Sequence, residues 1–65
     1  MFEPGKLIRI ALVSRGKTQV WLIDQLRAQG IITDKTELSS VLSGTRGGPK
    51  AETILATAKA ILALQ

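Results

Sequence analysis

The most informative polar residues of this chain lie on one side of a predicted helix over residues 34–43. The opposite side of that helix is apolar and carries Leu38, Val41 and Leu42. A helix of this kind fits the major groove of double-stranded DNA, where each base pair presents its own pattern of donors, acceptors and methyl groups. Short side chains let the helix backbone approach the base edges, whereas long charged ones would hold it away. The polar side consists of Lys35, Thr36, Ser39, Ser40 and Ser43.

Several kinds of chemistry are excluded by composition. The chain has 65 residues and contains neither cysteine nor histidine. Disulfides, thiol chemistry, imidazole acid–base catalysis and most zinc sites therefore cannot occur. The five carboxylates form no evident catalytic pair. We expect a protein that is not an enzyme and that needs no metal and no cofactor.

Charge points to the class of partner. Nine basic residues against five acidic ones give a net charge of +4. A small basic domain favours an acidic partner, with nucleic acid first and an anionic membrane second, although solubility alone would also account for the charge. No apolar run approaches the ~18 residues of a membrane span. Residues 1–4 lack a signal-peptide pattern, so we expect a soluble, cytoplasmic protein without a membrane partner.

Glycine and proline divide the chain into segments of helical length. Pro4 and Pro49 can open helices, because the first turn does not need the N–H that proline lacks. A glycine follows each of the first three segments, as is common at helix ends. Residues 7–13 are apolar enough for a strand, but these flanks favour a helix of about three turns. We predict one compact all-α domain over 1–65, with four helices at about 5–15, 19–29, 34–43 and 49–64.

Local signals support these boundaries. Thr18 is a good N-cap, and Asp34 with Glu37 three residues later resembles a capping box. Ile31, just beyond Gly30, can make the apolar contact that accompanies a helix end. Helical spacing predicts that the inward-facing residues are Leu7, Ile8, Ala11, Leu12, Leu22, Ile23, Leu26, Leu38, Val41, Leu42, Ile54, Leu55, Ala58, Ile61 and Leu62.

Three stretches in order carry a family resemblance. Arg15–Gln19 is followed by Leu22 and Leu26, then by Leu38–Arg46, and then by Pro49 and an Ala- and Leu-rich helix that includes Thr57–Leu62. They resemble the phage Cro/repressor type of helix-turn-helix domain, and the resemblance extends over roughly residues 7–63. The chain departs from the family at Ile23, where a small residue is usual, and in the longer link from Leu26 to Leu38. The resemblance implies a lambda repressor-like fold and a transcriptional regulator, of repressor type, that binds an operator in double-stranded DNA.

The resemblance also implies roles for individual residues. Base contacts fall on Lys35, Thr36 and Ser40, with Ser39 and Glu37 beside them. For Glu37 a role as the carboxylate at a helix N-terminus is an equal alternative, and for the two serines the alternative is an ordinary solvated face. The backbone phosphates are expected to meet Lys17, Thr18, Gln19, Ser43, Thr45 and Arg46.

Some apolar residues are expected on the surface and not in the core. Ile10, Val13 and Trp21 fall where relatives are usually polar, and Leu64 lies at the end of the last helix. We expect a protein interface at these four positions, facing away from the third predicted helix, with a homodimer as the simplest case and another regulatory protein as the alternative. Trp21 could instead pack against Phe2 in the core. The alternative function is a protein-interaction module on the same fold, such as an anti-repressor or an antitoxin-like partner.

Overall fold

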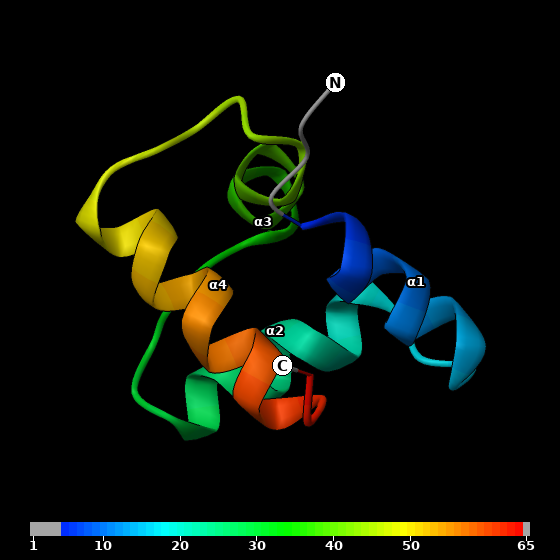
Figure 1. The fold of residues 1–65 in the computed structure, drawn as a ribbon. Coiled ribbons are helices and arrows are strands. Elements are labelled where there is room, and N and C mark those ends of the chain that lie inside the picture. The colour runs from blue at the N-terminus through cyan, green and yellow to red at the C-terminus, as the bar shows by residue number, and fades with distance from the viewer. Residues whose placement is uncertain (1–4, 65) are drawn as a thin grey trace.

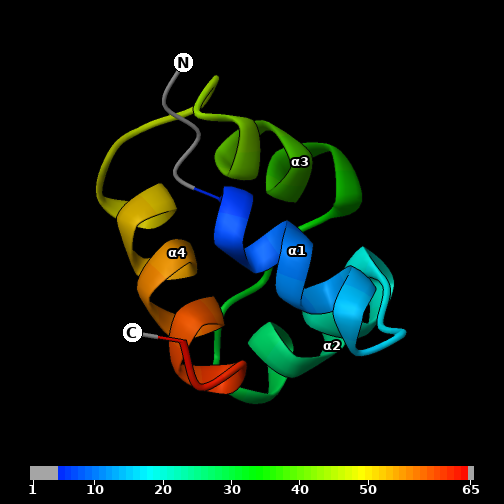
Figure 2. The same cartoon turned by 45° about the vertical axis from the view of Figure 1, so that its right-hand side comes forward.

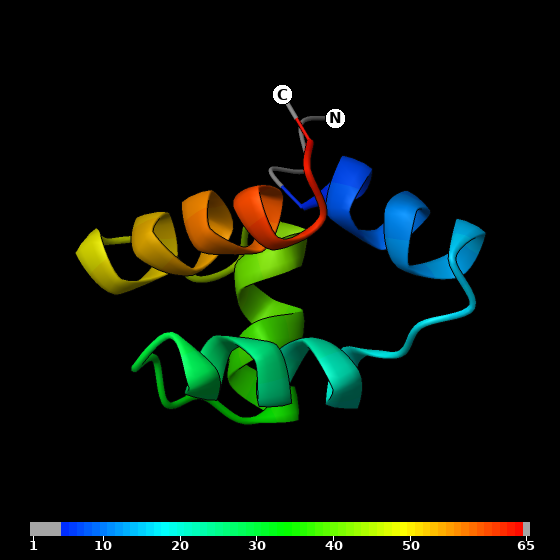
Figure 3. The same ribbon diagram turned by 90° about the horizontal axis from the view of Figure 1, so that it is seen from below.

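The third of the four helices described packs against the other three. The computed structural model describes residues 5–64, and within that range it contains helices and no strand. The helices are α1 (Lys6–Ser14), α2 (Gln19–Ala28), α3 (Lys35–Ser43) and α4 (Pro49–Ile61). α3 crosses between α2 on one side and α1 and α4 on the other (Figures 1 and 3). Figure 2 shows α1 in front, with the connection into α2 at its far end. The predicted all-α class is confirmed.

Each helix contributes one apolar stripe to a single core. Removing such side chains from water stabilises the fold by about 1.5–3 kcal/mol for each large one. Ile23, Leu55 and Ile61 were also predicted to face inward and are partly buried at the edge of this core. The core residues are Ile8, Ala11, Leu12, Leu22, Leu26, Leu38, Val41, Leu42, Ala51, Ile54, Ala58 and Leu62.

One predicted core residue is wrong. Leu7 is 56% exposed, whereas the adjacent Ile8 is fully buried. Successive residues of a helix point about 100° apart, and α1 buries only the narrow stripe of Ile8, Ala11 and Leu12. Leu7 therefore turns to the flank of the helix.

The predicted helix starts are confirmed by hydrogen bonds. Thr18 Oγ1 accepts from the N–H of Trp21 at 3.2 Å, and Asp34 Oδ1 accepts from the N–H of Glu37 at 2.7 Å. Each bond satisfies one of the N–H groups that the first turn of a helix leaves without a partner. A capping box would turn the carboxylate of Glu37 back toward residue 34. This carboxylate bonds instead to Thr33, Arg46 and Lys50.

Helix α4 ends at Ile61, three residues before the predicted end. Ala63 has a φ of 56°, in the left-handed region, and the N–H of Leu64 donates to the carbonyl of Lys59 at 2.8 Å. This turn folds Leu64 back onto the core, where it is partly buried. Leu64 therefore buries part of its side chain within the protein, although we expected it at a protein interface.

Trp21 is partly buried and packs against the core. The suggested contact between Trp21 and Phe2 lies outside the described residues. Residues 29–34 form the link between α2 and α3, and Ile31 within it packs on the core as predicted. None of the helices described is long and apolar enough to cross a membrane.

Backbone meets backbone where α1 begins. The N–H of Gly5 donates to the carbonyl of Leu42 at 2.9 Å, and Gly5 is buried. A Cβ at position 5 would lie 2.5 Å from both Cα and Cδ2 of Leu42. Only glycine leaves room for this contact, which ties the start of α1 to the end of α3.

Gly5→Ala is expected to lower the free energy of unfolding by about 1–3 kcal/mol, the usual cost of forcing extra atoms into a packed site. Gly47→Ala is the matched control, because a Cβ there meets nothing within 4 Å and the backbone is not left-handed. The control should change stability little, or raise it by restricting the unfolded chain. Urea denaturation measures both, and equal stabilities would contradict the steric argument.

Ala63→Gly is expected to raise the free energy of unfolding by about 0.5–1 kcal/mol, since glycine adopts the left-handed backbone without the Cβ penalty. Ala56→Gly, at an exposed position within α4, should instead lower the free energy of unfolding by about 1 kcal/mol, because glycine is a poor helix former. Thermal denaturation followed by circular dichroism compares the two. A destabilised Ala63→Gly variant would show that the left-handed turn does not persist in solution.

Candidate nucleic-acid interface

The polar side of α3 faces outward and borders an open hollow. Leu38, Val41 and Leu42 point into the core, which fixes the rotation of the helix. Lys35 and Thr36 are exposed, whereas the two serines that follow them are partly buried. We call this feature the α3 hollow; it is lined by Gln19, Lys35, Thr36, Ser39 and Ser40.

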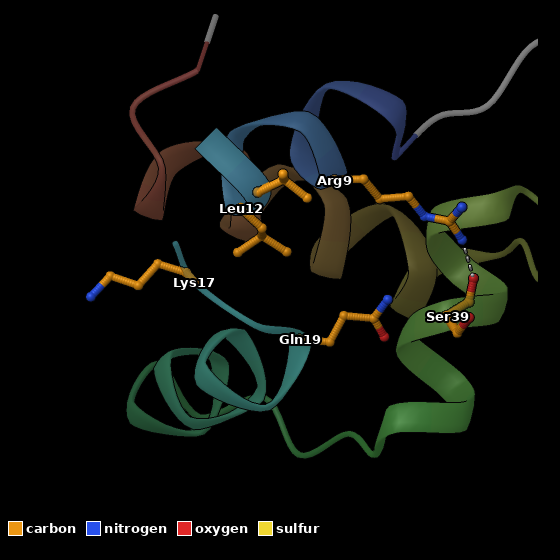
Figure 4. Close-up of a pocket in the computed structure, with 6 residues that line it drawn as sticks. Arg9, Leu12, Lys17, Gln19 and Ser39 are labelled. Atoms are coloured by element: carbon orange, nitrogen blue, oxygen red, sulfur yellow. Dashed lines mark hydrogen bonds between the residues drawn. The ribbon is translucent and has the colours of Figure 1, made fainter. Parts of the chain in front are cut away.

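Gln19 enters the α3 hollow from a different helix. It is the first residue of α2, and its carboxamide points into the space between α2 and α3 (Figure 4). Its Oε1 atom is buried and has no hydrogen-bond partner among the described residues. Leaving a buried acceptor without a donor costs about 1–3 kcal/mol, so the Gln19 side chain gains by turning its carboxamide toward a hydrogen-bond donor.

A second hollow adjoins the first. We call it the Arg9 hollow; α1 supplies Arg9, Leu12 and Val13, and Lys17, Gln19 and Ser39 complete it (Figure 4). Arg9 Nη2 donates to the backbone carbonyl of Ser39 at 3.5 Å. Lys17 Nζ lies 5.2 Å from the centre of the Trp21 ring, a distance typical of a cation–π contact.

The two hollows form one surface, because Gln19 and Ser39 line both. No acidic residue lines either hollow. Val13 was expected to face away from the third predicted helix, and this is wrong, because Val13 lines the same hollow as Ser39 of α3. Sequence reasoning also missed Arg9, since its place beside α3 follows from helix packing and has no local signal.

Glu37 lies on the other flank of α3 and holds a cluster of polar contacts. Its Oε2 is 3.0 Å from Arg46 Nη1, and its Oε1 is 3.0 Å from Lys50 Nζ. Thr33 Oγ1 also donates to Oε1 at 2.6 Å. The Glu37 side chain is 15% exposed, against more than half for its two cationic partners. Glu37 therefore joins the start of α3, the loop after it and the first turn of α4.

These contacts lower the pKa of Glu37 below its usual value. The largest cause is the hydrogen bond from Thr33, followed by the bond from Lys50, and the charges of Lys50 and Arg46 act in the same direction. Partial burial of the carboxylate opposes them. The ionised form of Glu37 is thus the one that the folded protein stabilises.

The remaining residues proposed for phosphate contact lie near helix ends. Ser43 Oγ donates to the carbonyl of Ser40 at 3.1 Å and lies 3.0 Å from Thr45 Oγ1. Arg46 is in the following loop and pairs with Glu37. Thr18 caps α2 and is exposed. The structure thus gathers Gln19 with the polar side of α3, brings Lys17 to the adjoining hollow, and places Ser43, Thr45 and Arg46 at and beyond the C-terminal end of α3.

Comparisons with known proteins give no relative from which the role of this surface could be inferred. No protein-family model, no curated protein and no solved structure matches the chain.

Acid should weaken the fold through Glu37. A carboxylate whose pKa is lowered by folding stabilises the protein above its unfolded pKa of about 4.3, and this contribution is lost as the pH falls through the lower folded value. Glu37→Gln should therefore be less stable than the unmodified protein at pH 7, and the gap should close below about pH 4. Glu52→Gln is the matched control, because Glu52 is a carboxylate at an exposed position of α4. Urea denaturation across pH 3–7 measures the gap, and a constant gap would rule out the ionised carboxylate as its cause.

Proposed function

We propose that this protein is a sequence-specific DNA-binding regulator of the cytoplasm, of repressor type, in which α2 and α3 act as a helix-turn-helix. The observation that carries the proposal is the α3 hollow. Side chains from the start of α2 and the polar side of α3 converge there, and no acidic residue lines the hollow. Base edges in the major groove require such an arrangement of donors and acceptors on a helix that can come close.

The side chains of the α3 hollow match the groups that bases present. Lys35 can donate to O6 and N7 of guanine, and the hydroxyls of Thr36 and Ser40 can bond to several base edges. When its side chain turns outward, Gln19 offers its unpartnered Oε1 together with an amide N–H, the pair that adenine N6 and N7 would satisfy. A phosphate offers only acceptors, so it would leave that buried oxygen without a donor. We therefore propose Gln19 as a base-reading residue in addition to the phosphate contact that the sequence suggested.

Phosphate contacts would position the domain without reading sequence. The N-terminus of α2 presents backbone N–H groups at Gln19, and Arg9 and Lys17 supply charge nearby. Arg46 with Ser43 and Thr45 would reach the backbone at the other end of α3. Glu37 is left out of the base-reading set, because in the free protein its carboxylate already holds Thr33, Lys50 and Arg46.

Selection of bound sequences from random duplex DNA, at a recorded salt concentration, tests the function directly. A sequence-specific regulator should enrich one motif, and a two-fold symmetric motif would indicate that two copies bind. Enrichment of no motif, with binding that depends only on salt, would reduce the function to general nucleic-acid binding.

Lys35→Ala and Ser40→Ala should each weaken binding to the selected site by about 1–3 kcal/mol where a good base contact is lost, and random duplex binding should change less. Lys59→Ala is the matched control for charge, because it removes one positive charge from α4 outside both hollows. Fluorescence anisotropy with labelled duplexes gives both affinities. Equal losses for Lys35→Ala and Lys59→Ala on the two duplexes would refute the assignment of Lys35 to base reading.

A further inference from the structure

The outer side of α1 carries apolar side chains that the other helices leave exposed. Ile10 is 52% exposed and Val13 is 80% exposed. Together with Arg9 and Ser14 they line a shallow hollow, which we call the apolar hollow. Contiguous apolar surface on a small protein commonly marks a place where another molecule binds.

The apolar hollow is continuous with the proposed DNA-binding surface. Arg9 and Val13 line both the apolar hollow and the Arg9 hollow. The Arg9 hollow in turn shares Gln19 and Ser39 with the α3 hollow. A molecule that filled the first two hollows would therefore lie against residues that border the α3 hollow.

The ionisable side chains that line the apolar hollow and the Arg9 hollow are basic. α1 contains Lys6 and Arg9 and no acidic residue, and Arg15 follows its last turn. Lys17 borders the Arg9 hollow. Among the described residues, every ionisable side chain that belongs to α1 or lines these two hollows is therefore basic. Complementary charge favours a partner that combines an apolar side with carboxylates.

A second copy of this chain does not supply that combination. Two α1 helices face to face would bring like charges together. Among the acidic residues that the structure describes, Asp34 caps α3 and Glu37 is ion-paired. The others, Asp24 and Glu52, are single carboxylates on different helices, so a second copy offers no row of acidic side chains along one helix, although Asp24 lies one turn from the exposed Val20. The homodimer that we expected from the sequence is therefore not the occupant that this surface favours.

We propose that an acidic amphipathic helix of a partner protein binds across the apolar hollow and the Arg9 hollow and competes with DNA. The apolar side of the partner helix covers Ile10 and Val13, which lie one turn apart, so that side chains of the two helices can interlock. Its carboxylates pair with Arg9 and Lys17. The guanidinium of Arg9 has five N–H donors, so it can bind a carboxylate in addition to the contacts that it makes within the chain, the bond to Ser39 among them. The competition, but not the contact itself, depends on the proposed DNA-binding function.

A display library of random 16-residue peptides without tryptophan tests the contact. Peptides selected on the whole protein should be acidic, with apolar residues three and four positions apart. Their affinity can be followed by the fluorescence of Trp21, the single tryptophan of the chain, because Lys17 lies over its ring. Selection of no peptide, or of peptides without net negative charge, would overturn the proposal.

Two variants locate the bound peptide. Val13→Gln should weaken binding of a selected peptide by at least tenfold, and Leu7→Gln by less than twofold. Both residues are exposed apolar positions of α1, but Leu7 lines none of the three hollows. Neither change removes a buried contact, so both variants should fold, which circular dichroism confirms. Equal effects of the two variants would place the peptide elsewhere and contradict the proposal.

Competition is measured last, with the duplex selected above. Saturating duplex should raise the apparent Kd of the peptide at least tenfold, and unchanged peptide affinity on DNA-bound protein would overturn the competition. If the protein binds no duplex at all, the proposed function fails, while the peptide selection and the Val13→Gln comparison still decide the contact on α1. The two failures are therefore separable.

Discussion

The burial of one side of α3 is the constraint on which the rest of the structure depends. Leu38, Val41 and Leu42 are at most 1% exposed, and α3 packs against all three other helices. Any rotation of α3 about its axis would bring these side chains toward water and polar ones into the core. The apolar side therefore determines which residues face outward, and it directs the polar side toward the α3 hollow. Core and candidate site are two sides of the same nine-residue helix.

Contacts at the start of α1 transmit that constraint to the neighbouring helix. Gly5 donates its N–H to Leu42 at the end of α3, and its own carbonyl accepts from the N–H of Arg9. Arg9 is thus one helical turn away from a fixed point on α3, and its guanidinium reaches the carbonyl of Ser39. A larger residue at position 5 would push the start of α1 away from α3 and would shift Arg9 with it.

The sequence predicts the local features of this protein well, because they depend on neighbouring residues. Helix starts at Thr18 and Asp34 follow from side chains that bond within the same turn. The same logic misjudges Leu7, because periodicity gives the direction of an apolar side but not how wide a stripe the other helices cover. It also misses the position of Arg9 and the partners of Glu37, since these depend on how α1 and α4 pack against α3. Gln19 and the polar side of α3 were each predicted from local sequence, but their meeting in one hollow depends on how α2 packs against α3.

The two flanks of α3 differ in the acidic residues that line them. On one flank Glu37 pairs with Lys50 and Arg46, so much of the local charge is neutralised within the protein. On the other flank no acidic residue lines the hollows that contain Arg9, Lys17 and Lys35. Charge alone would attract DNA and an acidic protein to this second flank equally. Discrimination must then come from the uncharged groups, because hydroxyls and an amide line the α3 hollow, whereas Ile10 and Val13 line the apolar hollow. Base edges can satisfy the first set of groups, and only an apolar side chain can cover the second.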